Sequence, residues 1–263
     1  MSAELTPLIF FVVILVSFLA SILTFYSGFG LGTLLLPVFA LWFPLREAVI
    51  MTAVVHLFNN LFKLALVKNF IDRFILIRFG LPALGAAILG SLALQWISEI
   101  NIAYPVKIGP FRASLTVLNL ILGLSILTFG ILEFIHFEKR LFGKRSLILG
   151  GILSGFFGGL SGHQGVLRSA FLIQYPLSKE VYIGTGVAIA CVIDVARLTI
   201  YSTDFPAVSG QGSYILVAVS ISAAVTGALV GNQLLKKVDI GIVKKITATG
   251  IIIMGLAILL GIV

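Results

Sequence analysis

Long apolar runs separated by short breaks constrain this chain more than any other feature. Six runs have the length of one membrane crossing, and they cover residues 48–66, 74–97, 115–135, 181–201, 214–235 and 240–262. A helix needs about 20 apolar residues to cross the hydrocarbon core of a bilayer. Hydrophobic residues make up 59% of the 263 positions and charged residues 11%, against about 45–50% and about 25% in soluble domains. We therefore expect a multi-pass membrane protein, which excludes a soluble enzyme and a disordered chain.

The positive charge of the chain lies in the breaks between the apolar runs. The sequence has 18 Lys and Arg against 10 Asp and Glu, a formal net charge of +8. Basic residues beside membrane helices mark the cytoplasmic side, so no nucleic-acid partner is expected. The opposite breaks hold only Arg46, Lys107 and Arg112. The breaks that we expect to face the cytoplasm hold twelve basic residues: Lys63, Lys68, Arg73, Arg78, Lys139, Arg140, Lys144, Arg145, Lys236, Lys237, Lys244 and Lys245.

Two further apolar segments, residues 7–43 and 146–175, are too long for one crossing and are interrupted by glycines. The interruptions read Ser-Gly-Phe-Gly-Leu-Gly from residue 27 and Gly-Gly-Leu-Ser-Gly-His-Gln-Gly from residue 158. The legs of the second segment would be roughly 22 and 15 Å long at 1.5 Å per residue, shorter than a core of about 30 Å. We expect two helical hairpins whose tips lie within the membrane, where irregular backbone must line a cavity or be buried in protein.

A hairpin followed by three helices occurs twice, in residues 1–138 and 139–263. Because three crossings follow each hairpin, the two halves enter the membrane from opposite sides. At an offset of 134 residues, Ser27-Gly28 aligns with Ser161-Gly162, Asn60 with Asp194 and Lys63 with Arg197. The sequence therefore predicts an all-α polytopic helical bundle with two inverted repeats, each a broken or re-entrant hairpin and three transmembrane helices, as in many secondary transporters.

Charged and polar residues inside these segments indicate a site for an anion. A charge at the centre of a membrane helix costs about 2.5–3.5 kcal/mol on insertion scales, and Arg168, Asp194 and Arg197 are all in such positions. The ends of broken helices attract anions, and the fork of an arginine side chain matches a pair of sulfite or sulfonate oxygens. The predicted substrate site comprises Ser27, Gly28, His56, Asn60, Ser161, Gly162, His163, Gln164, Arg168 and Arg197.

Two residues are candidates for proton coupling. Asp194 shares a helix face with Arg197 and with Cys191, and His163 has an ordinary pKa near 6.5. Structural alternatives stay open: a fixed Asp194–Arg197 pair, a histidine that only hydrogen-bonds, an arginine at 168 that extends to the membrane surface, and a cysteine that only packs. No metal-ligand spacing or phosphate-binding loop is present, so no catalytic residue, cofactor or metal is expected.

The glycine-rich run from Ser27 to Pro37, and its echo from Gly158 to Gly162, resemble the signature of the sulfite exporter TauE/SafE family. The resemblance covers nearly the whole chain and implies a multi-pass carrier of sulfur-containing anions in a prokaryotic inner membrane. In this sequence, His163 and Gln164 interrupt the second glycine run.

We therefore expect a secondary transporter that exports sulfite or an organosulfonate by alternating access, coupled to protons, with the lipid bilayer as its environment. The alternatives are an anion channel on the same fold, a cation or proton carrier that uses Asp194, and an intramembrane enzyme that uses His163 or Cys191.

Overall fold

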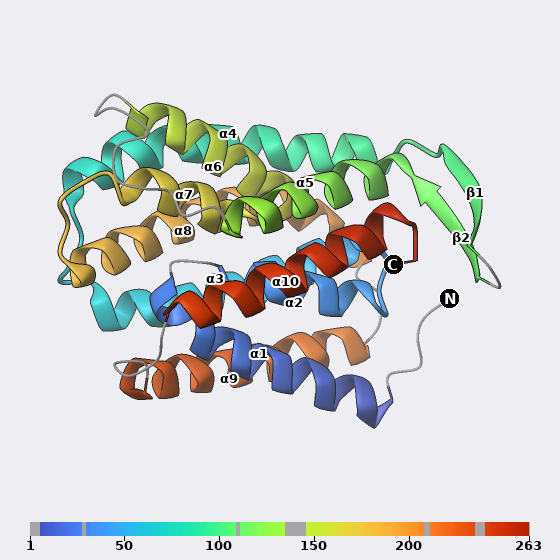
Figure 1. The fold of residues 1–263 in the computed structure, drawn as a ribbon, viewed down its shortest axis with the longest axis horizontal. Coiled ribbons are helices and arrows are strands. Elements are labelled where there is room, and N and C mark those ends of the chain that lie inside the picture. Colours follow the sequence, from blue (N-terminus) through green and yellow to red (C-terminus); the bar gives the residue numbers. More distant parts are fainter. Residues whose placement is uncertain are drawn as a thin grey trace.

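The structure is a computed structural model that describes residues 6–27, 30–108, 111–134, 146–207, 211–234 and 240–262. Helices dominate these residues (Figure 1). Their bounds are α1 Pro7–Ser27, α2 Gly32–Ala40, α3 Leu45–Val67, α4 Arg73–Ser98, α5 Val117–Phe134, α6 Ser146–Ser161, α7 Gln164–Leu172, α8 Lys179–Tyr201, the short η1 Ser202–Ala207, α9 Gln211–Leu234 and α10 Ile240–Leu259. The two strands are β1 Ala103–Ile108 and β2 Phe111–Thr116.

Helix length and composition place the chain in a membrane. Within the described residues, α1, α3, α4, α8 and α9 each contain an apolar stretch long enough to cross a bilayer. Large apolar side chains are exposed on the outside of the bundle, for example Leu81 at 65% and Leu89 at 62%, whereas Asp194 and Arg197 are fully buried. An apolar surface with the charged side chains buried inside the bundle is the arrangement expected of a protein in lipid. The predicted fold class, an all-α polytopic membrane protein, is confirmed.

The helix starts follow local sequence signals. Asp72 precedes α4 and its side chain accepts a hydrogen bond from the Ile75 amide at 2.9 Å. Ser178 does the same for Val181 at the start of α8, at 3.3 Å. Such N-caps satisfy amide groups that have no partner within the helix, and so they fix where α4 and α8 begin.

Glycines allow the closest helix pair, α4 and α6, to pack backbone against backbone. A Cβ added to a glycine on this face of α6 would lie only 2.1–2.3 Å from a carbonyl oxygen of α4. Small residues spaced by four on one helix face allow this approach. The facing residues recur every four positions on both helices, and they are Gly151 with Phe79, Gly155 with Ala83, and Gly159 with Ala87.

The helix contacts repeat in a regular pattern when α1–α5 are matched in order with α6–α10. Under this matching, the contact of α1 with α9 corresponds to that of α6 with α4, and the contact of α3 with α9 to that of α8 with α4. The pairs α3–α8 and α5–α10 each correspond to themselves. Figure 1 shows α1 beside α9 along one edge of the bundle and α4 beside α6 along the other. The inverted relation of the two halves stays a prediction.

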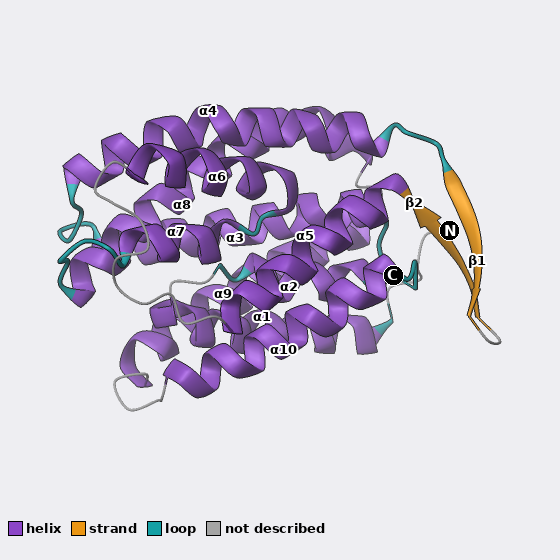
Figure 2. Ribbon diagram, turned by 45° about the horizontal axis from the view of Figure 1, so that its top comes forward, coloured by secondary structure: helices purple, strands orange, loops and turns teal. Residues whose placement is uncertain are grey.

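The two ends of the bundle differ in charge. The start of α1, the end of α10 and the β1–β2 hairpin lie at one end, here the hairpin end (Figures 1 and 2). The links from α3 to α4 and from α7 to α8 lie at the other end, here the basic end, where Lys68, Arg73 and Lys179 are exposed. Of the other predicted cytoplasmic basic residues, Lys139, Arg140, Lys144, Arg145, Lys236 and Lys237 fall outside the described residues.

The β1–β2 hairpin was not expected from the sequence. Its strands pair antiparallel, with Ala103 opposite Thr116 and Ile108 opposite Phe111, and Figure 2 shows it extending away from the helices. The helix predicted from residue 115 therefore begins at Val117, because Leu115 and Thr116 pair with the other strand. The apolar run from residue 115 includes the last two residues of β2, so hydropathy alone does not mark where the strand ends and the helix begins.

We expect Gly155→Ala to destabilise the protein. The new methyl group would lie 2.2 Å from the Ala83 carbonyl oxygen, so α4 and α6 would have to separate, which costs about 1–3 kcal/mol. The matched control is Gly85→Ala on α4, where an added Cβ meets nothing within 4 Å. Thermal unfolding of detergent-purified protein checks this: a lower midpoint is expected for Gly155→Ala alone, and equal midpoints would contradict the packing described.

Candidate functional site

The breaks in the two hairpins meet inside the bundle. The first separates α1 from α2 and includes Gly30; the second, at Gly162 and His163, separates α6 from α7. A Cβ added to Gly32, the first residue of α2, would lie 3.8 Å from the Gly162 carbonyl oxygen. The helix ends at both breaks therefore lie side by side, at a depth where their backbone is enclosed by protein.

Glycine at each break allows a polar side chain to approach the backbone. Gly162 has a φ of +81°, a conformation that L side chains rarely adopt. A Cβ at this position would lie 2.8 Å from Nη1 of Arg197, and a Cβ at Gly30 would lie 2.7 Å from Nε2 of His56. These two glycines therefore make room for Arg197 and His56.

Asp194 is at the centre of a buried hydrogen-bond cluster next to both breaks. Its Oδ2 accepts hydrogen bonds from Nδ1 of His56 at 2.7 Å and from Nδ2 of Asn60 at 3.0 Å. Its Oδ1 accepts from Nε2 of Gln164 at 3.1 Å and lies 2.9 Å from Nη2 of Arg197. The donors come from α3, α7 and α8 itself, so this one carboxylate connects three helices. We call these five residues the Asp194 cluster.

The ion pair of the cluster lies in a low-dielectric interior, where its stability depends on how many of its remaining polar atoms are bonded. Asp194 and Arg197 are both fully buried, and among the described residues Nε of Arg197 has no hydrogen-bond partner. Both carboxylate oxygens have two partners each, and Nη1 of Arg197 donates to the Gly158 carbonyl at 3.4 Å. The ion pair considered from the sequence is present, and it is part of a larger network.

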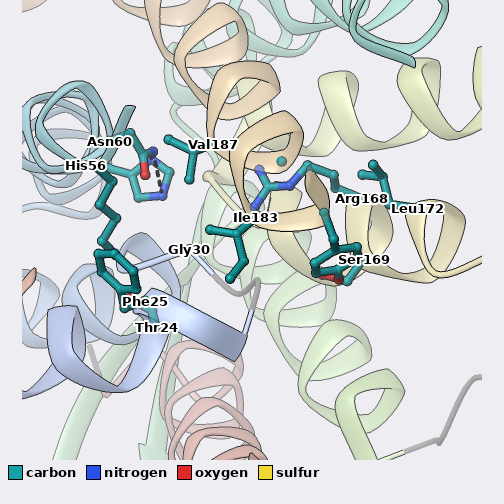
Figure 3. Close-up of a pocket in the computed structure, with 13 residues that line it drawn as sticks. Thr24, Phe25, Gly30, His56, Asn60, Arg168, Ser169, Leu172, Ile183 and Val187 are labelled. Carbon is teal, nitrogen blue, oxygen red and sulfur yellow. Dashed lines mark hydrogen bonds between the residues drawn. The ribbon is translucent and has the colours of Figure 1, made fainter. Parts of the chain in front are cut away.

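A pocket lies between the Asp194 cluster and the basic end. It is a small, partly open cavity, in which about 20 Å³ admits the centre of a water-sized molecule. Figure 3 shows His56 and Asn60 on one side of it and Arg168, Ser169 and Leu172 on the other. Its lining combines cations, hydroxyl groups and apolar side chains from α1, α3, α7 and α8, with Gly30 from the first break: Thr24, Phe25, Gly30, His56, Asn60, Lys63, Arg168, Ser169, Leu172, Tyr182, Ile183, Gly186 and Val187.

Arg168 connects this pocket to the cluster. Its Nη1 donates to Oε1 of Gln164 at 3.3 Å, and the amide nitrogen of the same Gln164 side chain donates to Asp194. Arg168 is 6% exposed, so the alternative in which it extends to the membrane surface is wrong. Gly186 of α8 lies beside this side chain, and a Cβ there would be in ordinary contact with Nε of Arg168 at 3.4 Å.

Lys63 also lines the pocket, although it was not among the site residues predicted from the sequence. It was counted among the basic residues of a cytoplasmic break, but α3 continues to Val67, and Lys63 is 4% exposed. Its Nζ lies 5.4 Å from the centre of the Phe25 ring. The alignment of Lys63 with the buried Arg197 at an offset of 134 residues was the signal that could have identified it.

The structure brings together five of the ten residues predicted for the substrate site. His56, Asn60, Gln164 and Arg197 contact Asp194, and Arg168 lies one hydrogen-bonded residue away. Gly162 lies against Arg197 at the second break. The side chain of Ser27, and the whole of Gly28, fall outside the described residues. Four pocket residues carried no distinguishing sequence signal, since hydroxyl and aromatic residues are frequent in these segments: Thr24, Phe25, Ser169 and Tyr182.

His163 and Ser161 lie at the second break but away from the pocket. Nδ1 of His163 is 3.0 Å from the Ser161 carbonyl oxygen, and its ring stacks on Phe129 with 5.9 Å between centroids. The hydroxyl of Ser161 donates to the Phe157 carbonyl at 3.1 Å. Both side chains are buried, and their contacts fix the turn between α6 and α7.

Neither a reactive cysteine nor a metal centre is found in the described part of the chain. Cys191 is buried in an apolar cluster with Ile183 and Val187, which supports the packing alternative. No group of three or more His, Cys, Asp or Glu side chains among the described residues is placed to hold a metal ion.

We expect Arg197→Met to be strongly destabilising, because it leaves the Asp194 carboxylate buried with one fewer positive partner. Removing one member of a buried ion pair costs about 3–5 kcal/mol. The double variant Asp194→Asn/Arg197→Met removes both charges and should recover much of that loss. Thermal unfolding of both single variants and the double variant measures the coupling; additive effects would show that the pair contributes no coupling energy.

A comparison with known protein families gives a match over nearly the whole chain. The sulfite exporter TauE/SafE family matches residues 13–258 of the 263. The match includes both helix breaks, the Asp194 cluster and every residue that lines the pocket. A comparison with curated proteins found no match. By this match over nearly its full length, the chain belongs to the sulfite exporter TauE/SafE family of membrane transporters.

Proposed function

We propose that this protein is a secondary transporter that exports a small sulfur-containing anion, sulfite or an organosulfonate, across a prokaryotic cytoplasmic membrane. The observation that carries the proposal is the pocket beside the two helix breaks, which is lined by the buried cations Arg168 and Lys63. Ionisable side chains inside a membrane bundle are rare, and they mark substrate or ion pathways. Helix ends at a break add further attraction for an anion.

The contacts of Asp194 favour an anion over a cation as substrate. Both of its oxygens already accept hydrogen bonds, and Arg197 lies within ion-pair distance. A cation would have to displace His56, Asn60, Gln164 or Arg197 to reach the carboxylate. An anion in the pocket would instead lie beside two cations, because Arg168 and Lys63 both line it.

The structure fits a transporter open toward the cytoplasm. By the positive-inside rule, the basic end faces the cytoplasm, and the pocket lies on that side of the Asp194 cluster. At the hairpin end, Arg46 forms an ion pair with Asp204 at 2.6 Å, and Nε2 of Gln95 donates to Asp204 at 3.0 Å. Below them, the hydroxyl of Tyr201 donates to the Gly159 carbonyl. These contacts join α3, α4, α6 and the α8–η1 region, and they close the outer side.

Two inverted repeats, residues 1–138 and 139–263, provide a way to alternate access. The matched contacts of α1–α5 and α6–α10 support this division. The glycine-mediated pairs α4–α6 and α1–α9 each join one helix from either half, so each pair moves as a unit. Rocking of these units about α3 and α8 would open the hairpin end and close the basic end. The Asp194 cluster lies at the α3–α8 contact, where both halves reach it.

Saturable flux of labelled sulfite into liposomes that contain the purified protein tests the proposal. We expect flux that saturates with sulfite concentration and falls at least about tenfold in Arg168→Gln, since a charge-assisted contact would be lost. The control is Lys68→Gln, which removes an exposed charge five residues after Lys63. Flux that rises linearly without saturation would support the channel alternative, and absence of flux for sulfite and organosulfonates would contradict the proposal.

Proton coupling is expected to depend on Asp194, which shares a hydrogen bond with the titratable ring of His56. In Asp194→Asn the amide cannot take up a proton, so flux should no longer respond to an imposed pH gradient. The measurement is sulfite flux with and without that gradient, normalised to the amount of monodisperse protein. If Asp194→Asn responds to the gradient as the wild type does, coupling is assigned to His163. If neither protein responds, transport is uncoupled.

Loss of the Arg46–Asp204 ion pair should increase opening at the hairpin end. Both side chains are partly buried, 29% and 13% exposed, and such a pair is worth about 1 kcal/mol, or roughly fivefold in an equilibrium. Ser91 of α4 is fully buried, and its hydroxyl donates to the same Gly159 carbonyl as Tyr201 does. Labelling of Ser91→Cys, in a Cys191→Ser background, by a membrane-impermeant thiol reagent from outside should therefore accelerate about fivefold in Arg46→Gln. Lys68→Gln should leave the labelling rate unchanged. Equal rates in all three would mean that this ion pair does not hold the outer side closed.

A further inference from the structure

We propose that the exported anion has a second position beyond the Asp194 cluster, where the hydroxyl of Thr52 donates a hydrogen bond to it beside Arg197. We call these two residues the outer subsite. The inference rests on the proposed function and adds to it a substrate contact on the hairpin-end side of the cluster. It follows from the hydrogen bonding and the position of one buried hydroxyl.

Thr52 carries a buried hydroxyl that has no hydrogen-bond partner among the described residues. The residue is only 2% exposed. Other hydroxyls on the helices of this bundle donate to the carbonyl four residues earlier, as those of Thr24, Thr199 and Ser220 do. A buried hydroxyl without a partner lowers the stability of the fold, so its presence is better explained by a ligand than by packing.

Thr52 and Arg197 both lie on the hairpin-end side of the Asp194 cluster. Helix α3 ends at the basic end of the bundle and α8 begins there, so the two helices run in opposite directions (Figure 1). Thr52 precedes His56 by four residues, and Arg197 follows Asp194 by three. Because His56 and Asp194 are hydrogen-bonded to each other, Thr52 and Arg197 are each about one helical turn nearer the hairpin end.

Both residues border the point where the two helix breaks meet. A Cβ added to Gly32 would lie 3.4 Å from Cγ2 of Thr52 and 3.8 Å from the Gly162 carbonyl oxygen. A Cβ added to Gly162 would lie 2.8 Å from Nη1 of Arg197. Helix ends at such breaks attract anions, so the outer subsite flanks backbone that favours the same ligand.

Arg197 has a donor available for an anion while it is paired with Asp194. Its Nη2 lies 2.9 Å from Oδ1 of Asp194, and its Nη1 donates to the Gly158 carbonyl at 3.4 Å. Its Nε has no hydrogen-bond partner among the described residues. An anion can therefore bind at the outer subsite without breaking the ion pair.

The predicted inverted repeats give the outer subsite the same positions as the pocket. At the offset of 134 residues, Thr52 aligns with Gly186 and Arg197 with Lys63. Gly186 and Lys63 both line the pocket. Inverted repeats exchange roles when access alternates, so the state that opens at the hairpin end is expected to line its cavity with Thr52 and Arg197.

The contacts that close the outer side lie beyond this subsite. Tyr201 follows Arg197 by four residues on α8, and its hydroxyl donates to the Gly159 carbonyl. The Arg46–Asp204 ion pair lies farther toward the hairpin end. An anion on its way out therefore meets the outer subsite between the cluster and the contacts that must open.

Thr52→Val tests the hydroxyl, because valine has nearly the same shape and cannot donate a hydrogen bond. The readout is the sulfite concentration that gives half-maximal exchange of labelled sulfite. It is measured from the outside in right-side-out membrane vesicles and from the cytoplasmic side in inverted vesicles. Thr52→Ser keeps the hydroxyl. The matched control is Ser17→Ala on α1, which removes another buried hydroxyl that has no partner among the described residues.

We expect the half-maximal concentration of Thr52→Val to rise at least about tenfold from the outside, since a hydrogen bond to a charged ligand is lost. From the cytoplasmic side it should stay unchanged. Thr52→Ser and Ser17→Ala should behave as the wild type on both sides. The unfolding midpoint of Thr52→Val should equal or exceed that of the wild type, because the variant no longer buries an unpartnered hydroxyl.

A second measurement separates a lost contact from a shift toward the state that is open to the cytoplasm. The labelling rate of Ser91→Cys from outside, in the Cys191→Ser background, reports how often the outer side opens. An apparent affinity scales with the fraction of protein in the competent state. The product of this rate and the outside half-maximal concentration is therefore independent of the equilibrium, and Thr52→Val should raise it at least about tenfold.

An unchanged product in Thr52→Val would overturn this inference while leaving the proposed function intact. So would an equal rise of the half-maximal concentration from both sides, or a rise as large in Ser17→Ala. If Thr52→Val does not fold, Thr52→Ala, which also lacks the hydroxyl, decides by the same product. If the wild type exchanges neither sulfite nor an organosulfonate, the proposed function fails, and this inference fails with it.

Discussion

The carboxylate of Asp194 is the group on which the arrangement of the bundle interior depends. It is the buried acidic side chain among the described residues, and its four partners come from α3, α7 and α8. A buried carboxylate needs all of its hydrogen-bond and ion-pair partners, because the loss of one leaves its negative charge less compensated in a low-dielectric interior. The cluster thus fixes where the end of one broken helix meets two central helices, and the pocket is the space left beside it.

The glycines make this arrangement sterically possible. Gly151, Gly155 and Gly159 bring α6 against α4 at backbone distance, and Gly162 and Gly30 admit Arg197 and His56 to the two breaks. Close packing is the main source of helix association in lipid, where no hydrophobic force acts between helices. The glycines on α6 therefore stabilise the bundle, and Gly30 and Gly162 provide the irregular, polar backbone that a substrate can approach.

Much of the fold could be predicted because the membrane restricts the chain so strongly. Hydropathy located the long helices, and the glycine breaks at residues 27–32 and 158–165 indicated the broken segments. The β1–β2 hairpin was missed because most of it lies in the break between two apolar runs, where hydropathy gives no signal for secondary structure. Lys63 was assigned to a cytoplasmic break because it lies only four residues before the end of α3. So close to a helix end, the sequence alone does not show whether a basic residue lies inside the bundle or at the membrane surface.

The candidate site was predictable in its residue types but not in its connections. Buried charge identified Arg168, Asp194 and Arg197, since such residues are rare inside membranes. The hydrogen bonds from His56 and Asn60 to Asp194 join residues 138 and 134 positions apart. The offset of 134 residues aligned Asn60 with Asp194, but an alignment of repeats does not show that two side chains touch. The position of His163 against Phe129, away from the pocket, likewise depends on the packing of α5 near α7.

We propose that the pocket lined by Arg168 and Lys63 binds the transported anion. The most direct test is an experimental structure of the protein with selenate, a heavier analogue of sulfate whose selenium is identified by anomalous scattering. The expected result is a selenium peak within the pocket, with oxygens in hydrogen-bond distance of Arg168 and Lys63. A fully occupied selenate elsewhere in the bundle, with the pocket empty and the protein active, would contradict the account.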